Sequence, residues 1–191
     1  MKKRIITIAG FPGSGKSSTA RGVAHSLGYE HFSSGDLFRK MAADRGLTVE
    51  EINFTAEKQK EIDREVDELL ARIGREKDSF VIDSRIAFHW IPKSFKVFLD
   101  LDPRRAAERT FAHIQKNGRV SQTAVSVEEV QANTRRRIES EQKRYRSLYN
   151  LDFMDKSQFD LVVDTAANNL EQVIRHVITE YQKWLNASDH G

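Results

Sequence analysis

The chain has 191 residues, enough for one domain with a hydrophobic core; it is 39% hydrophobic and 31% charged, with a formal net charge of +3. The absence of cysteine excludes disulfides and thiolate metal sites, and it leads us to expect a cytoplasmic location. No stretch approaches the roughly 20 apolar residues of a membrane helix, and the small positive excess suits an anionic ligand but is too weak to indicate nucleic acid.

The first predicted elements are a strand over Arg4–Ala9 and a helix over Lys16–Leu27. The loop between them fits the phosphate-binding pattern G-x-x-x-x-G-K-[ST] with an extra glycine: Gly10-Phe11-Pro12-Gly13-Ser14-Gly15-Lys16-Ser17. Such a turn can wrap backbone N–H groups around phosphate oxygens, and the helix adds its positive N-terminal end. In this pattern Lys16 reaches the β and γ phosphates, and the Ser17 hydroxyl ligates Mg²⁺. Residues from Gly10 to Ser18 therefore predict a nucleoside triphosphate site; the alternative is a chance glycine turn.

Strands and helices continue to alternate along the chain. After the first helix we expect a strand over Tyr29–Phe32 and three helices, over Gly35–Asp44, from Thr48, and over Ile62–Ile73. Two strands follow, over Phe80–Asp83 and Phe95–Asp100, and then two helices, one from Pro103 and one from Ser126 toward Tyr149. The last elements are a strand over Leu161–Asp164 and a helix over Asn169–Leu185. Short apolar strands separated by helices indicate an α/β fold with a parallel sheet covered on both faces.

Two clusters should join the phosphate loop, because ligands of such sheets gather at the carboxyl ends of the strands. After the second strand, Ser34 and Asp36 can cap the helix, and Arg39 lies one turn beyond Asp36. After the third strand, Asp83 stands where a carboxylate orients Mg²⁺ or its water, and Arg85 can fork onto a phosphate. The alternatives are a capped helix with an exposed arginine and a turn aspartate with a surface arginine.

The downstream half supplies many arginines, most of which must lie on solvated helix faces. Phosphoryl transfer needs a few of them, because charge spreads over the equatorial oxygens of the transferred group. They are Arg104, Arg105, Arg109, Arg119, Arg135, Arg136, Arg137, Arg144 and Arg146. Three histidines, His31, His89 and His113, show no carboxylate–histidine arrangement at metal-ligand spacing, and we interpret them as packing or surface residues.

The phosphate loop, Ser34-Gly35-Asp36-x-x-Arg39 and the arginine after the third strand together resemble the nucleoside monophosphate kinases, with a P-loop NTPase fold. Three further stretches are similar to the short, archaeal-type cytidylate kinases, and the similarity runs up to about Tyr181: residues 61–65, 137–152 and 159–165. One departure is Asp83-Ser84-Arg85, where similar cytidylate kinases usually show Glu-Gly-Arg. The following residues 86–90 are also bulkier and more aromatic than usual.

The resemblance implies transfer of the ATP γ-phosphate to CMP or dCMP with Mg²⁺, by a monomer with no nucleic-acid or membrane partner. It implies acceptor binding by Ser34, Asp36, Arg39, Asp83 and Arg85, and metal binding by Ser17 and Asp83. The implied catalytic residues are Lys16, Arg109, Arg119, Arg137 and Arg144. Asp152 belongs to the similar stretch, and its alternative is a role in the turn after a helix.

The implied organisation is a core of residues 1–33, 78–109 and 127–185, with an acceptor-binding insertion at about 34–77 and a short lid at about 110–126. Two rival functions stay open. One is a P-loop kinase for another small phosphorylated or hydroxyl metabolite, and the other is a nucleotide-switched RNA-binding module.

Overall fold

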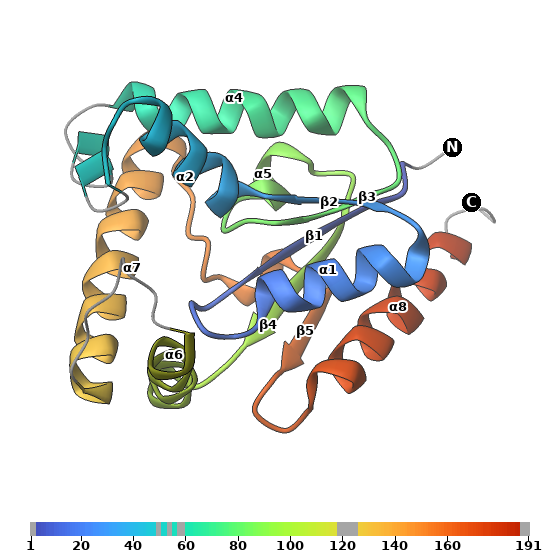
Figure 1. The fold of residues 1–191 in the computed structure, drawn as a ribbon. Helices are drawn as coiled ribbons and strands as arrows, with labels where there is room; N and C mark the ends of the chain where they lie inside the picture. Colours follow the sequence, from blue (N-terminus) through green and yellow to red (C-terminus); the bar gives the residue numbers. More distant parts are fainter. Residues whose placement is uncertain (1–2, 49–50, 53–54, 57–59, 118–125, 188–191) are drawn as a thin grey trace.

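The computed structural model describes residues 3–48, 51–52, 55–56, 60–117 and 126–187 (Figure 1). In these residues one parallel five-stranded sheet has the order β2-β3-β1-β4-β5. Its strands are β1 (Ile5–Gly10), β2 (Glu30–Ser33), β3 (Phe80–Asp83), β4 (Phe95–Asp100) and β5 (Leu161–Asp164). The bounds of β3, β4 and β5 are those predicted, because each is an apolar run that a polar residue ends.

The helices follow the predicted alternation. They are α1 (Lys16–Leu27), α2 (Ser34–Asp44), α4 (Lys60–Glu76), α5 (Ala87–Trp90), α6 (Pro103–Asn117), α7 (Val127–Tyr149) and α8 (Leu170–Asn186), with a 3₁₀ turn at Lys156–Gln158. Helix α4 extends beyond the predicted Ile62–Ile73 at both ends, where polar residues continue it without adding to its apolar stripe. Neither α5 nor the 3₁₀ turn was predicted, because a four-residue helix has no apolar period to detect.

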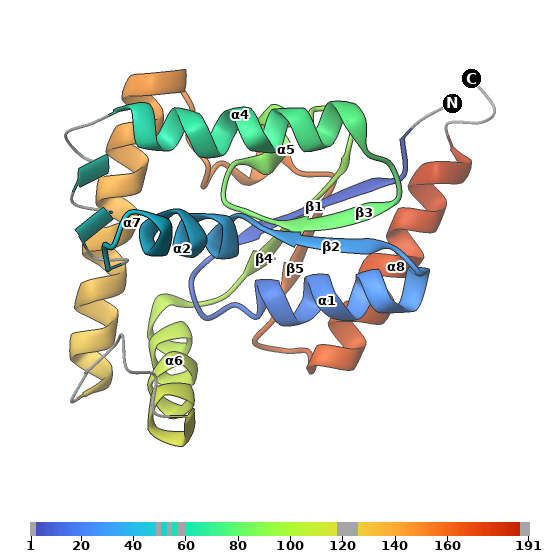
Figure 2. The same cartoon turned by 45° about the horizontal axis from the view of Figure 1, so that its top comes forward.

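Helices cover both faces of the sheet, which confirms the predicted α/β architecture (Figures 1 and 2). On one face Ile6 and Ile8 of β1 pack with α1 and α8, in a cluster that includes Val23 and Val177. On the other face Ile5 packs with α4 and α5. Because neighbouring residues of a strand point to opposite faces, every residue of the central strand β1 is buried.

Side-chain caps fix several helix starts at the predicted positions. Thr48 and Glu51 form both bonds of a capping box, in which each backbone N–H donates to the other side chain. The Asp102 carboxylate accepts from the backbone at the start of α6, and the Ser126 hydroxyl accepts from the backbone N–H of Glu129 at the start of α7.

Helix α7 brings distant residues to the carboxyl ends of the strands. Its Ile138 packs with Ala9 of β1 and Phe98 of β4. Its first half packs along α6, where Val130 meets Ala107 and Ile114 (Figure 1). No helix in the described part of the chain is both long and apolar enough to cross a membrane.

Candidate active site

The phosphate loop joins β1 to α1 in a conformation that requires glycine. Gly13 has φ +83°, and a Cβ there would lie 2.6 Å from the Ala106 carbonyl oxygen of α6. Gly15, with φ +89°, is the N-cap of α1 and offers no side chain to the first turn of the helix. The first N–H groups of α1 are thus left for an anionic ligand, as the sequence pattern predicts.

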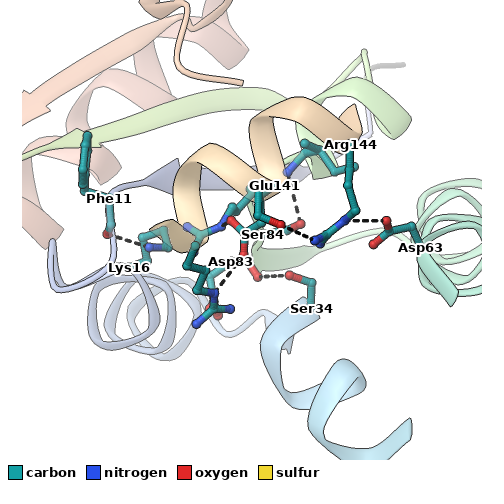
Figure 3. Close-up of polar contacts among 12 residues, drawn as sticks. Phe11, Lys16, Ser34, Asp63, Asp83, Ser84, Glu141 and Arg144 are labelled. Carbon is teal, nitrogen blue, oxygen red and sulfur yellow. Dashed lines mark hydrogen bonds and ion pairs between the residues drawn. The ribbon is translucent and has the colours of Figure 1, made fainter. Parts of the chain in front are cut away.

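The Lys16 side chain folds back over this loop. Its Nζ donates to the Phe11 carbonyl oxygen at 2.7 Å (Figure 3). Burial, and then the nearby positive charge of Arg85, lower the pKa of the ammonium group to about 7. A phosphate at this position would supply the negative charge that favours the protonated form.

Asp83, at the end of β3, accepts three side-chain hydrogen bonds. Its Oδ2 accepts from Ser17 Oγ at 2.8 Å and from Ser33 Oγ at 3.1 Å, and its Oδ1 lies 2.6 Å from His31 Nε2. The side chain is only 6% exposed. Burial acts to raise the pKa of Asp83, but the hydrogen bonds from His31 and the two serines hold it below its usual range.

Ser17 and Asp83 fit a magnesium ion. Both offer hard oxygen atoms, and the depressed pKa keeps the carboxylate ionised. Across the described ranges no group of three or more His, Cys, Asp or Glu side chains is arranged to hold a metal. Mg²⁺ at Ser17 and Asp83 would therefore take its remaining ligands from substrate phosphates and water, as Mg²⁺ commonly does.

Two of the predicted phosphate-binding arginines share one carboxylate, Glu141 in the middle of α7. Arg85 Nε forms an ion pair with Glu141 Oε2, and Arg137 Nε donates to Glu141 Oε1 at 2.9 Å. Although burial acts to raise the pKa of Glu141, the charges of Arg85 and Arg137 hold it below its usual range. The sequence interpretation gave Glu141 no role; the four-residue spacing from Arg137 was the available signal.

Arg144 reaches toward Asp63 of α4, and its positive charge also acts on Glu141 (Figure 3). Its Nε donates to Asp63 Oδ2 at 2.9 Å, and its Nη1 donates to Ser140 Oγ at 3.1 Å. One turn further along both helices, Tyr149 Oη donates to Asp67 Oδ2 at 2.5 Å. Burial raises the pKa of Asp63, and it raises that of Asp67 to about 7. These contacts tie the second half of α7 to α4.

The residues of α2 that were predicted to bind the acceptor lie at different depths. Ser34 Oγ donates to the Asp83 backbone carbonyl at 3.4 Å, so it lies beside the end of β3 (Figure 3). Arg39 is 57% exposed and pairs with the exposed Asp36 one turn before it. Its guanidinium lies over Gly35 at the start of the helix.

The remaining predicted residues separate into three cases. Arg109 Nη2 donates to the Thr165 carbonyl oxygen at 2.8 Å, which ties α6 to the end of β5. Arg119 lies outside the described residues, as do residues 118–125 of the predicted lid. Asp152 accepts from the side chains of Gln142 and Arg146 in the turn after α7, which is the structural alternative given for it.

The interpretation of His31 as a packing or surface residue is wrong. Residues two apart in a strand share a side, and Ser33 pairs in register with Asp83, so His31 and Asp83 meet between neighbouring strands. That register follows from strand order, which a single sequence does not give. His89 is exposed, with its ring edge-on to that of Trp90 and tilted against that of Tyr149, and His113 is exposed, in agreement with the interpretation.

Comparison with known proteins adds a family to this geometry. Residues 9–152 match a family model described as an AAA domain. A cytidylate kinase of Natronomonas pharaonis is 39% identical over 183 residues, covering 93% of this chain and 90% of the relative. A cytidylate kinase of Halorubrum lacusprofundi is 37% identical over 190 residues, covering 98% of this chain and 94% of the relative. Among solved structures, a shikimate kinase from Bacteroides thetaiotaomicron shares the fold, with a TM-score of 0.61 and 15% identity. The match covers 97% of this chain and 98% of the shikimate kinase.

Proposed function

The chain belongs to the cytidylate kinase family, and on that premise we propose that it transfers the γ-phosphate of ATP to CMP or dCMP, giving ADP and CDP or dCDP. One observation carries the proposal beyond family membership. The phosphate loop, the Ser17–Asp83 pair and the Arg85–Glu141–Arg137 cluster meet at the carboxyl edge of one sheet. A triphosphate, a metal ion and a second phosphate can therefore share one site.

The donor half of the site is the phosphate loop from Gly10 to Ser18. Its backbone N–H groups and the start of α1 would hold the phosphates, with Lys16 moving from the Phe11 carbonyl onto the γ-phosphate. Ser17 and Asp83 would hold Mg²⁺, which neutralises charge on the phosphate oxygens when bound.

The acceptor half would lie between α2 and α7. Arg39 and Arg85 would hold the phosphate of the monophosphate, and Ser34 and Asp36 would lie beside it. That phosphate is itself the nucleophile, and its oxygen is already ionised at neutral pH. No strong base is needed, and transfer depends on positioning and on cations that stabilise the developing charge. We assign that stabilisation to Lys16 and to one or more of four arginines: Arg109, Arg119, Arg137 and Arg144.

The proposed division of the chain follows from these roles. Residues 34–77 would form the acceptor-binding part and residues 110–126 the lid that brings Arg119 to the phosphates. Closure of such a lid excludes water that would otherwise take the γ-phosphate.

An acceptor panel tests the proposal. Purified protein with ATP and Mg²⁺ is given CMP, dCMP, UMP, AMP or GMP, and ADP formation is measured. We expect CMP and dCMP to be best, UMP weaker, and AMP and GMP poor. AMP or GMP as the best acceptor would overturn the cytidylate assignment, and equal ADP formation without acceptor would favour a nucleotide switch. Lys16→Met, which should lose about 10²–10³ in turnover, controls for a contaminating kinase.

A further inference from the structure

We propose that His31 is a positioning residue of the transfer site, which fixes the Asp83 carboxylate so that its Oδ2 stays directed at Ser17. The proposal rests on the proposed function and adds a residue to it. His31 lies in β2, an edge strand of the sheet, and its ring reaches across to the end of β3.

The two carboxylate oxygens of Asp83 have different neighbours. Oδ2 accepts from the hydroxyls of Ser17 and Ser33, whereas His31 is the donor to Oδ1 at 2.6 Å. Because Asp83 is ionised and can only accept, the ring must present an N–H at Nε2. Because donors hold both oxygens, the carboxylate is restrained from rotating about its Cβ–Cγ bond. Two donors on the same oxygen would restrain this rotation less.

The position of His31 makes this contact hard to replace. The imidazole is 20% exposed, and the carboxylate is almost fully buried. Among the side chains of the described residues, no other donates to Oδ1. Without His31, the carboxylate could turn toward the cation of Lys16, which already interacts electrostatically with Asp83. The geometry between Ser17 and Asp83 would then be lost although both residues remain.

Groups that orient a metal-binding carboxylate typically contribute 10- to 100-fold to metal affinity or activity. His31 is therefore expected to affect the use of Mg²⁺ more than the binding of nucleotide. A purely structural role, in which His31 only holds β2 against β3, would instead lower stability and leave the metal dependence unchanged.

The test compares two variants of His31 that differ by one methylene. In His31→Gln the amide N–H lies near the place of Nε2 and can reach Oδ1, whereas in His31→Asn it lies near the place of Nδ1 and falls short. His31→Leu removes the donor, and His25→Leu, at an exposed position of α1, is the matched control. The free energy of unfolding of each variant is measured by urea denaturation.

Two readouts are taken for each variant. One is the Mg²⁺ concentration that gives half-maximal turnover of CMP; the other, without turnover, is Mn²⁺ affinity for the protein–ADP complex, followed by electron paramagnetic resonance of free Mn²⁺. We expect both metal constants to rise about 10- to 100-fold in His31→Asn and His31→Leu, and to stay within about threefold of wild type in His31→Gln and His25→Leu. ADP affinity without metal should change little.

Equal metal constants in the glutamine and asparagine variants, or in all variants and wild type, would overturn the positioning role. A failure of the proposed function is distinguishable, because the wild-type protein would then form no ADP with CMP while the Mn²⁺ measurement would still compare the variants. If His31→Leu does not fold, the metal constants of His31→Gln and His31→Asn still decide whether His31 positions the carboxylate.

Discussion

Arg144 and Asp63 lie 81 residues apart in the chain, yet Arg144 Nε donates to Asp63 Oδ2 at 2.9 Å. Asp63 is buried and the Arg144 side chain is only 11% exposed, and the pair joins the second half of α7 to the start of α4. Helix α7 also carries Arg137 and Glu141, so this contact sets where the cluster of charges near Arg85 lies. The geometry of the site therefore depends on a pair outside the phosphate loop.

Removing Asp63 should destabilise the protein strongly, because it leaves a buried guanidinium without its carboxylate. We expect Asp63→Ala to lower the free energy of unfolding by about 3 kcal/mol or more. The matched control is Glu65→Ala, which breaks the exposed pair of α4 with Arg45 and should cost less than about 1 kcal/mol. Urea denaturation measures both, and equal losses would contradict a structural role for the buried pair.

Arg39 offers a test of acceptor binding that is free of stability effects. Because the side chain is exposed and pairs only with Asp36 among the contacts described, Arg39→Ala should leave the free energy of unfolding unchanged. Loss of a charged hydrogen bond to the acceptor phosphate should raise the KM for CMP about 10- to 100-fold, with little change in the KM for ATP. Arg45→Ala, just beyond the end of α2, is the control. Equal rises in the two constants would show that Arg39 does not serve the acceptor alone.

Most of the fold could be predicted because its signals are local. The bounds of α1 follow from the glycines on either side, and those of β3 and β4 from apolar runs that end at Asp83 and Asp100. Helix α5 was missed because its four residues show no period, and its aromatic sequence gives no cap.

The candidate site likewise contains residues that the sequence predicted and residues that it did not. The phosphate loop is a contiguous pattern, and Asp83 was identified from its place at the end of an apolar strand. The partners of Asp83, Arg85 and Arg144 were not predicted, because His31, Glu141 and Asp63 approach them through strand register and helix packing. Such contacts depend on strand order and on where α7 crosses the sheet, which no stretch of a single sequence encodes.

Asp67 should make stability depend on pH near neutrality. Burial raises its pKa to about 7 in the folded protein, against about 4 when unfolded. Between these values the folded state binds more protons than the unfolded state, so this group lowers the free energy of unfolding as pH rises from about 4 to about 7, by at most about 1.4 kcal/mol per pH unit. In Asp67→Asn that loss should be absent. The free energy of unfolding of the variant should therefore rise relative to that of wild type as the pH increases from about 4.5 to about 7.5.

The measurement is urea denaturation of both proteins at several pH values, with the difference between them plotted against pH. Carboxylates that do not act on Asp67, such as Asp83 with its lowered pKa, affect both proteins alike and cancel in the difference, whereas Asp63, whose charge acts on Asp67, contributes to it together with Asp67. A difference that does not change over this range would show that Asp67 is ionised throughout. Glu68→Gln, an exposed position next to Asp67, controls for a change in net charge.

The last prediction concerns Arg137, whose guanidinium is half exposed although its partner Glu141 is buried. An arginine held in this way can leave the carboxylate for a phosphate, while Arg85 continues to neutralise Glu141. If it acts on the charge that develops during transfer, Arg137→Ala should lower turnover by about 10²–10³, with little change in the KM for ATP or CMP. Arg136→Ala, at the exposed neighbouring position, should remain near wild type. Arg119→Ala is assayed in parallel, with ATP hydrolysis in the absence of CMP measured for each variant. Unchanged turnover in both Arg137→Ala and Arg119→Ala would remove these residues from the transfer step and assign the stabilising charge to Arg109 and Arg144.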